Sequence, residues 1–245
     1  MTPVHPIDAE GTSEAVWTEW PGLVQLPEAD VSAWARVVVL AAHPDDEVLG
    51  AGGTIARLAA AGTRLRLVAV TDGEASHPGH PDPSRLARRR AAETGAALRA
   101  LGAASCEVVR LGWPDAGLTG AQDALAAAVA PLVAGFDMCL APWEGDLHGD
   151  HEAVGRAVRL TGVPACFYPV WMWHWARPAD SRVPWDQARR VPLQRSMTER
   201  KQAAIACFAS QLEFRAPGVP PMLSAGFLEH FARDWEVLFP VGTRP

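Results

Sequence analysis

Apolar runs alternate with amphipathic stretches over residues 36–175. The run at 37–42 is an unbroken series of Val, Leu and Ala, which is typical of a parallel strand covered on both faces. Similar runs predict further strands over 64–71, 105–111, 136–141 and 165–170. Between the strands, apolar positions recur with the helical period and predict helices over 47–61, 83–101, 121–133 and 152–160.

Glycine and proline mark where these elements end. Gly62 and Gly102 follow two of the predicted helices and are expected to stop them. Pro131 lies inside the third helix and is expected to end or bend it. A stretch rich in Pro and Arg at 176–195 predicts a long irregular loop that borders the site. Two C-terminal helices are expected over 196–210 and 227–238, and no element is predicted for residues 1–35.

The alternation of strands and helices predicts an α/β fold. We expect a doubly wound, mostly parallel sheet with right-handed crossovers, covered by helices in a three-layer α/β/α arrangement. The common strand order for such a sheet is 3-2-1-4-5, which makes the first and fourth strands neighbours and opens a ligand crevice beyond their carboxyl ends. The chain of 245 residues is read as a single domain, with the sheet in 36–175 and the loop and C-terminal helices in 176–245.

Two polar clusters follow the strands that this order makes neighbours. His43, Asp45 and Asp46 come directly after the first strand, and His148, Asp150 and His151 come shortly after the fourth. The topology therefore predicts that two segments about a hundred residues apart meet in one site.

The residue types in these clusters indicate a metal centre. His43 and Asp46 are three residues apart at the start of a helix, so both can reach one cation, and His151 would supply a third ligand. Two imidazoles and one carboxylate leave a position open for water, which is the arrangement of catalytic zinc. Bound zinc lowers the pKa of that water to about 7.

The remaining residues of the clusters have the chemistry to assist hydrolysis. Asp45 is suited to be the general base, and His148 could stabilise the oxyanion of a tetrahedral intermediate. Asp150 could hydrogen-bond an imidazole and fix its tautomer. The alternative is that the aspartates only cap the following helix and complement its dipole. The convergence of two such clusters on one crevice favours the metal site.

Composition and charge exclude several classes of protein. The 22 basic and 28 acidic residues give a formal charge of −6, and no Lys/Arg run is long enough for a nucleic-acid groove or an anionic membrane surface. The four cysteines form no C-x-x-C pair and are expected to be reduced thiols. No apolar stretch reaches the ~18 residues of a membrane span, and no signal sequence is evident, so a cytoplasmic location is expected. The oligomeric state is left open.

At the two clusters the chain resembles a known family. The string Ala-His-Pro-Asp-Asp-Glu at 42–47, followed by Gly-Ala-Gly-Gly at 50–53, resembles the signature of the PIG-L/LmbE-like deacetylases. His-Gly-Asp-His at 148–151 resembles that family's second motif, commonly His-Pro-Asp-His. Gly149 replaces a rigid proline but removes no ligand. These deacetylases are zinc enzymes that remove acetyl groups from N-acetylglucosamine-containing substrates.

The resemblance covers approximately residues 36–212 and implies roles for individual residues. It implies a Rossmann-like hydrolase in which His43, Asp46 and His151 hold zinc. Asp45 would be the base and His148 the electrophilic or acidic partner. It also places Arg90 and Asp115 where sugar hydroxyls are contacted, although Arg90 could equally be an exposed helix arginine.

Further substrate contacts are predicted from position alone. Glu74, Trp113 and Trp143 follow the second, third and fourth strands, although Glu74 could simply shape the turn around Gly73. Tryptophans alternate at 171, 173 and 175 after the fifth strand, which predicts that they share one face with Trp173 at its centre. Such a face could stack on a sugar ring or an apolar aglycone, or it could be a hydrophobic cover for the C-terminal helices.

Three classes of function are compared. The first is a metal-dependent hydrolase that removes an acetyl or other acyl group from the amide of an N-acetylglucosamine-type sugar or glycoconjugate, or from another amide in a thiol or natural-product conjugate. The second is a non-haem iron oxygenase, since two His and one carboxylate also bind Fe²⁺. The third is a nucleotide-binding module, but Gly50, Gly52 and Gly53 do not form G-x-G-x-x-G. The expected cofactor is Zn²⁺, with another divalent ion such as Fe²⁺ as the alternative.

Overall fold

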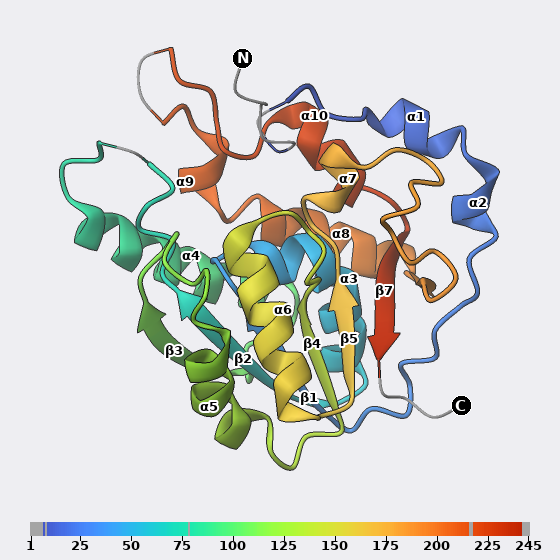
Figure 1. Ribbon diagram of the computed structural model, residues 1–245, viewed down its shortest axis with the longest axis horizontal. Helices are drawn as coiled ribbons and strands as arrows, with labels where there is room; N and C mark the ends of the chain where they lie inside the picture. Colours follow the sequence, from blue (N-terminus) through green and yellow to red (C-terminus); the bar gives the residue numbers. More distant parts are fainter. Residues whose placement is uncertain (1–6, 8, 78, 216–217, 242–245) are drawn as a thin grey trace.

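One mixed sheet forms the centre of the part of the chain that the computed structural model describes, which is residues 7, 9–77, 79–215 and 218–241. The strands are β1 (Arg36–Ala41), β2 (Arg64–Thr71), β3 (Glu107–Trp113), β4 (Met138–Pro142), β5 (Ala165–Tyr168), β6 (Arg189–Pro192) and β7 (Trp235–Val241). They lie in the order β3-β2-β1-β4-β5-β7-β6 (Figure 1). The predicted order 3-2-1-4-5 is confirmed, and β7 and β6 extend it.

Helices cover both faces of this sheet. The longer ones are α3 (Asp46–Ala60), α4 (Pro83–Ala100), α5 (Gln122–Val133), α6 (Gly149–Thr161) and α8 (Arg195–Ile205). The short ones are α1 (Glu14–Thr18), α2 (Pro21–Val24), α7 (Met172–Trp175), α9 (Ala209–Leu212), α10 (Ala225–Leu228) and the 3₁₀ turn η1 (Glu229–Phe231). Figure 1 shows α5 and α6 on one face and α3, α4 and α8 on the other. The three layers are those expected for a doubly wound fold.

The central strand β1 determines where the site forms. It pairs in parallel with β2 on one side and β4 on the other, and from Val37 to Ala41 every residue is buried. A strand buried on both faces needs the continuous apolar sequence that the chain supplies. The loops after β1 and β4 therefore leave the same sheet edge side by side.

The C-terminal part differs from the prediction. A helix was expected over 227–238, but helical structure ends at Phe231 and β7 follows, antiparallel to β5. The expected irregular loop at 176–195 contains β6, which pairs with β7. The predicted helix at 196–210 is divided into α8 and α9. Short apolar segments fit a buried strand as well as a helix, and only the distant partner strand decides between them.

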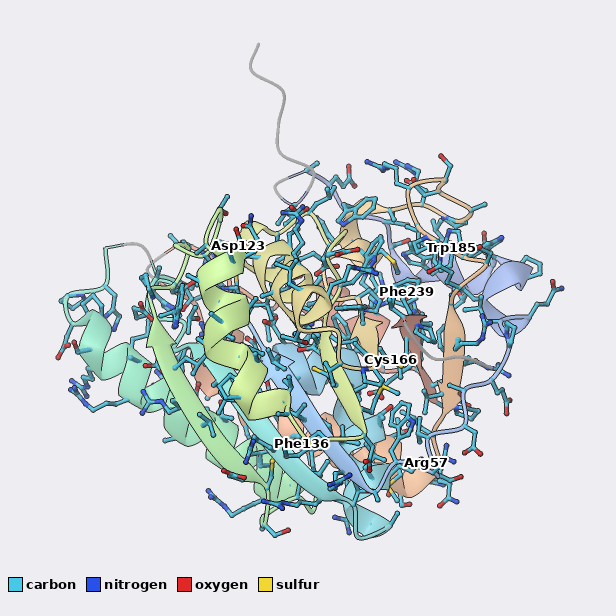
Figure 2. All side chains as sticks on the ribbon, turned by 60° about the horizontal axis from the view of Figure 1, so that its bottom comes forward. Arg57, Asp123, Phe136, Cys166, Trp185 and Phe239 are labelled. Atoms are coloured by element: carbon cyan, nitrogen blue, oxygen red, sulfur yellow. The ribbon has the colours of Figure 1, made fainter. Side chains whose placement is uncertain are left out.

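The N-terminal segment, for which no element was predicted, packs on the body of the protein. Trp17 in α1 is fully buried, and its indole Nε1 donates a 2.8 Å hydrogen bond to the carbonyl of Trp173. Its ring lies 5.9 Å from that of Trp185, which Figure 2 labels beside the N-terminal helices. Residues 9–35 thus contain part of the core.

Two smaller expectations can also be compared with the structure. Pro131 does not end α5 at once, since the helix continues for two more residues to Val133. Pro131 and Ala127, whose carbonyl loses its helical partner, are both exposed, so water can satisfy that carbonyl. Within the described residues, all four cysteines are free, and no helix is long and apolar enough to cross a membrane.

A buried ion pair ties the C-terminal elements to α3. The helix is interrupted at Ala51, whose φ of −142° is not helical, so the next turn starts with free backbone N–H groups. Glu236 of β7 accepts hydrogen bonds from the amides of Gly53 and Thr54, at 2.8 Å each. Lys201 of α8 lies 2.8 Å from the same carboxylate. The pair therefore caps the second half of α3.

Candidate active site

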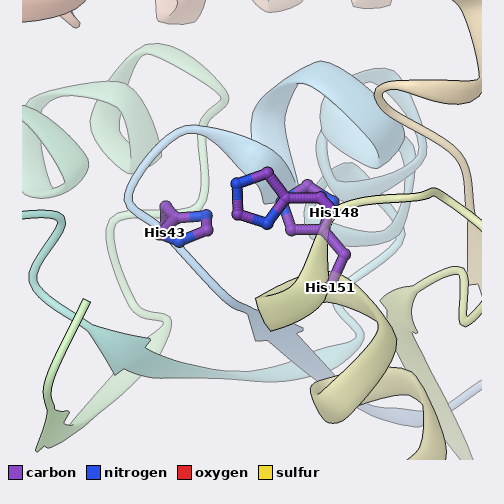
Figure 3. Close-up of side chains that lie close together, drawn as sticks. All are labelled: His43, His148 and His151. Atoms are coloured by element: carbon purple, nitrogen blue, oxygen red, sulfur yellow. The ribbon is translucent and has the colours of Figure 1, made fainter. Parts of the chain in front are cut away.

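The loops after β1 and β4 bring three histidines together, as the topology predicted. His43 follows β1, His148 caps the start of α6, and His151 lies in the first turn of α6 (Figure 3). The three ring centroids are 4.5–5.4 Å apart, and one nitrogen of each ring lies within 4.8 Å of the others. This arrangement could hold a metal ion.

Asp46 lies between two of these imidazoles. His43 Nδ1 is 3.4 Å from Asp46 Oδ2, and His151 Nε2 is 3.2 Å from Asp46 Oδ1. All three residues are largely buried, and Asp46 is the first residue of α3. The set that the sequence predicted as metal ligands therefore shares one small volume.

The outer nitrogen of each of these two imidazoles also contacts a carboxylate. His43 Nε2 is 3.1 Å from Asp150 and 3.1 Å from Asp115. His151 Nδ1 is 2.7 Å from Asp146. If each outer nitrogen donates its proton to a carboxylate, each inner nitrogen carries only a lone pair. That lone pair then faces an Asp46 oxygen, which is also a hydrogen-bond acceptor. Two such atoms at 3.2–3.4 Å repel each other unless a cation lies between them. The donor set therefore fits a divalent metal such as Zn²⁺ or Fe²⁺.

Further orphaned atoms support this fit. His151 Nε2 and His148 Nδ1 are buried and have no hydrogen-bond partner among the described residues. Buried polar atoms are seldom left unpaired, so two such atoms on rings whose centroids are 4.5 Å apart indicate a site for a ligand.

Asp45 is held in an unusual backbone conformation beside this centre. Its φ is +131°, a region that is unfavourable for a residue with a side chain, and such strain is found most often at functional sites. The Arg90 guanidinium donates to Asp45 Oδ2 at 3.1 Å and to the Pro44 carbonyl at 2.6 Å. Glu47, fully buried, accepts from the Asp45 amide at 3.2 Å. These contacts hold the carboxylate at the pocket wall.

Burial and mutual charge shift the pKa values of the carboxylates. Burial raises the pKa of Asp45 to about 7, with Arg90 opposing the rise and Asp46 adding to it. Burial also raises the pKa of Glu47 to about 8. The pKa of Asp46 would rise with burial too, but its contacts with His151 and His43 hold it well below its usual range. Adjacent carboxylates in different environments can therefore take different roles.

The imidazoles are shifted in opposite directions. Burial lowers the pKa of His151, but attraction to Asp46 and the bond to Asp146 outweigh it and raise the pKa to about 9. Burial would also lower the pKa of His43, yet its carboxylate partners raise it well above the ordinary value. His148 has no such partner, and burial together with repulsion from the other two rings lowers its pKa to about 3. His148 is therefore a neutral imidazole near pH 7.

The site opens into a pocket with two different walls. One wall is polar and contains Arg90, Ser76 and Gln211 beside the centre. The other is apolar: Trp171 stacks on Phe227 at a centroid distance of 4.7 Å, and Met222 and Leu223 continue the surface. The pocket therefore suits a ligand that is polar on one side and apolar on the other.

Asp115 and Arg90, placed by resemblance at the sugar, have further contacts. Asp115 lines the pocket and reaches His43 Nε2, and its other oxygen accepts from the Ala75 amide at 2.8 Å. Arg90 is only 2% exposed, so its alternative as an exposed helix arginine is wrong. Its guanidinium also donates to the Gly73 carbonyl at 2.9 Å. Both residues border the site, and contact with substrate stays a prediction.

The other predicted contact residues lie elsewhere. Trp113, Trp143, Trp173 and Glu74 are not among the described residues that line the pocket. Residues 172–175 form α7 rather than a strand, so the expected shared face of alternating tryptophans is wrong. Trp173 is buried against Trp17, and Trp143 is buried against Trp175 and Phe239. Glu74 accepts a 3.0 Å hydrogen bond from the Asp115 amide. Trp171 is the tryptophan that reaches the pocket.

Asp146 is a functional candidate that the sequence reasoning missed. It is fully buried and bonds His151, and it also accepts from backbone amides at 170–172. Its only sequence signal is an acidic residue five positions before His151.

The glycines at 50–53 do not form a phosphate-binding loop. Gly50 packs on Tyr168, and the Gly53 amide is already bonded to Glu236. The nucleotide-binding alternative therefore lacks its free amides.

Fold and site together define an α/β protein with a His- and Asp-lined, metal-type centre at the switch point of its sheet. The family model of PIG-L, described as GlcNAc-PI de-N-acetylase, matches residues 38–161, and the chain belongs to this family. That match includes both histidine clusters.

Individual relatives show how far the similarity extends. The 1D-myo-inositol 2-acetamido-2-deoxy-alpha-D-glucopyranoside deacetylase of Kineococcus radiotolerans is 35% identical over 102 residues, which are 38% of this chain and only 28% of that protein. The structure of the A40926 pseudoaglycone deacetylase Dbv21 superposes with a TM-score of 0.65 at 21% identity, covering 85% of this chain and 97% of that one.

A third structure shares the fold but has a different name. The 4-carboxy-2-hydroxymuconate hydratase GalB of Pseudomonas putida KT2440 superposes with a TM-score of 0.58 at 18% identity, covering 86% of this chain and 97% of that one. At these identities the structures show a common fold, so the reaction has to be argued from the site.

Proposed function

We propose that this protein is a metal-dependent amide hydrolase that removes the acetyl group from an N-acetylglucosamine-type sugar or sugar conjugate. The observation that carries the proposal is the pair of imidazoles whose inner nitrogens face Asp46, with the strained Asp45 beside them. Membership of the PIG-L family and the deacetylase relatives support the choice of reaction.

His43, Asp46 and His151 would hold the metal, proposed as Zn²⁺. When bound, a divalent cation supplies Lewis acidity, which polarises an amide carbonyl and makes water easier to deprotonate. Asp115, Asp150 and Asp146 orient the two imidazoles through their outer nitrogens.

Asp45 would accept the proton of the attacking water. Its pKa of about 7 lets the carboxylate take a proton near neutral pH and later give it to the departing amine. Arg90 keeps the carboxylate aimed at the pocket. His148, neutral because of its low pKa, would act as a hydrogen-bond donor to the oxyanion rather than as a charged acid.

A reconstitution assay tests the reaction class. Protein stripped with a chelator is loaded with Zn²⁺, Co²⁺ or Fe²⁺ and given N-acetylglucosamine, an inositol glycoside of it and N,N'-diacetylchitobiose. We expect equal amounts of acetate and free amine from at least one substrate, with none from chelated protein or from His151→Ala. Product formation that requires Fe²⁺, O₂ and a reductant would instead identify an oxygenase. Release of no amine with any metal would contradict the proposal.

A further inference from the structure

Asp146 bonds two parts of the site at once. Its Oδ2 lies 2.7 Å from His151 Nδ1 and accepts from the Trp171 amide at 2.9 Å. Its Oδ1 accepts from the amides of Val170 and Met172 at 3.1 and 2.7 Å. The side chain is fully buried, so no water competes for these bonds. One carboxylate therefore connects an imidazole of the metal-type centre to the start of α7.

Each of these two partners has a separate task. The inner nitrogen of His151 faces Asp46, so the ring must carry its proton on the outer nitrogen to bind a cation. Trp171 belongs to the apolar wall of the pocket and stacks on Phe227. The position of that wall depends on the backbone that Asp146 holds.

We propose that Asp146 is a positioning residue that couples occupation of the metal site to the order of the pocket wall at residues 170–172. The coupling rests on the metal site of the proposed function but not on the reaction. A cation that immobilises the His151 ring also restrains the carboxylate, and the carboxylate restrains the three amides. Because coupling is reciprocal, releasing the amides of residues 170–172 from Asp146 should also weaken metal binding.

An amide at this position cannot serve both partners. Asp146→Asn offers one acceptor and one donor group where two acceptors are used. If its NH₂ group faces His151, the ring must accept at Nδ1 and carry its proton on Nε2, which blocks metal ligation. If the NH₂ group faces the other way, it meets the amides of Val170 and Met172, donor against donor. In either orientation, the variant loses its contact with His151 in the form that binds metal or its contacts with the amides of Val170 and Met172.

The same loop has a second attachment that does not touch His151. Thr12 of the N-terminal segment donates from Oγ1 to the Ala176 carbonyl and from its amide to the His174 carbonyl at 2.8 Å. Thr12→Val removes only the hydroxyl contact. It is therefore a matched control that loosens the loop from the side remote from the metal centre.

Hydrogen exchange of the wild-type protein tests the coupling without any substitution. Exchange is measured by mass spectrometry on apo protein and on protein with added Zn²⁺ alone, in the peptide covering 166–176. We expect zinc to slow exchange of the amides at 170–172 about fivefold or more. In His151→Ala this protection should disappear. Unchanged exchange at 170–172 in zinc-loaded wild-type protein would overturn the proposal.

Metal affinity of the variants provides the second test. Competition with a chromophoric chelator should show zinc binding about 10- to 100-fold weaker in Asp146→Asn than in wild type. Exchange at 170–172 should be faster in the variant. Thr12→Val should speed exchange near residue 176 and leave zinc affinity within about threefold. Wild-type zinc affinity together with wild-type exchange in Asp146→Asn would contradict the proposal.

These measurements separate two kinds of failure, because neither uses a substrate. An inactive protein that shows the coupling would overturn only the proposed deacetylation. A protein that binds none of Zn²⁺, Co²⁺ and Fe²⁺ would overturn both.

Discussion

Two buried charged clusters contact the same helix, α3, and they differ in how their polar atoms are satisfied. At the start of the helix, Asp46 lies 3.2–3.4 Å from a ring nitrogen of each of two histidines, and His151 Nε2 has no hydrogen-bond partner among the described residues. At the break after Ala51, both oxygens of Glu236 accept hydrogen bonds from α3, and Lys201 completes the pair. The first cluster leaves buried nitrogens of His148 and His151 unpaired and could hold a metal ion, whereas the second satisfies its own polar atoms.

The difference separates a functional cluster from a structural one. Burying a polar or charged group is unfavourable unless its partners are provided, so a cluster that leaves buried nitrogens unpaired indicates a site where something binds. A cluster with its bonds made contributes to the fold instead. Burial and charge alone do not distinguish the two.

The largest effect is expected from substitutions in the first cluster. Asp45→Asn should keep stoichiometric zinc and lose turnover by about 10²- to 10⁴-fold, because only the base is removed. His151→Ala should lose the metal as well, and activity with it. Metal content by atomic emission and acetate release on the same samples measure both. Near-wild-type turnover in Asp45→Asn would rule out the assigned base.

In the second cluster the expected effect is on stability. Glu236→Gln leaves a buried Lys201 without its counter-charge and should lower the free energy of unfolding by about 3–5 kcal/mol. Zinc affinity of the folded variant should be unchanged. Urea unfolding measures the free energy of unfolding, and competition with a chelator measures the zinc affinity.

The control for this variant is the same substitution in an exposed pair. Glu199→Gln breaks the contact with Arg195, whose side chain is 92% exposed, and should change stability by less than about 1 kcal/mol. Equal effects of Glu199→Gln and Glu236→Gln would contradict the structural role of the buried pair.

Substitution of His148 tests whether this residue of the first cluster binds metal or only assists catalysis. Its ring is 4.5 Å from that of His151, and it is proposed to stabilise an oxyanion rather than to bind metal. His148→Ala should lower turnover by about 10²- to 10³-fold and leave zinc bound. A loss of zinc equal to that of His151→Ala would make it a metal ligand instead.

The smallest effect is expected at a third, largely buried charged cluster that ties the N-terminal segment down, in which Glu14 contacts His230 and Arg233. Burial raises the pKa of Glu14, but hydrogen bonds from His230 and Arg233 outweigh it, and the pKa lies below the ordinary value of 4.5. A lowered folded-state pKa means that the stabilisation is fully present above about pH 4.5 and is lost as the pH falls through the folded value.

Glu14→Gln should therefore destabilise the protein by about 1.5–3 kcal/mol at pH 7 and by progressively less as the pH is lowered to 3. Urea unfolding of variant and wild type across this range gives the difference. Glu28→Gln, in the exposed pair with Arg190, is the control and should show little change at any pH. A difference that grows with acid would contradict the assignment.

The parallel half of the fold and the meeting of the His/Asp clusters could be predicted because their signals are local. The strand that ends at Ala41 is apolar throughout, and His43 and Asp46 follow within a few residues. One long-range prediction was needed, that β1 and β4 are adjacent strands, and the common strand order of such sheets provides it.

The parts that could not be predicted depend on distant partners. β7 is largely apolar and has a buried centre, and pairing with β5 about 70 residues earlier decides that it is a strand. Asp146 could not be identified because most of its hydrogen-bond partners are backbone amides 24–26 residues later in the chain. Tryptophan at every second position suggested a strand face that includes Trp173. The same spacing occurs here in a short helix, and the sequence does not distinguish the two.

The tryptophan cluster under the N-terminal segment has a practical consequence. Trp17 lies 5.2 Å from Trp173 and 5.9 Å from Trp185, and the Arg233 guanidinium lies 4.0 Å from the Trp173 ring. Indoles held at such distances and fixed angles give a near-ultraviolet circular dichroism signal that vanishes when they separate. The protein thus contains an optical reporter for the docking of its first helix, readable without any label.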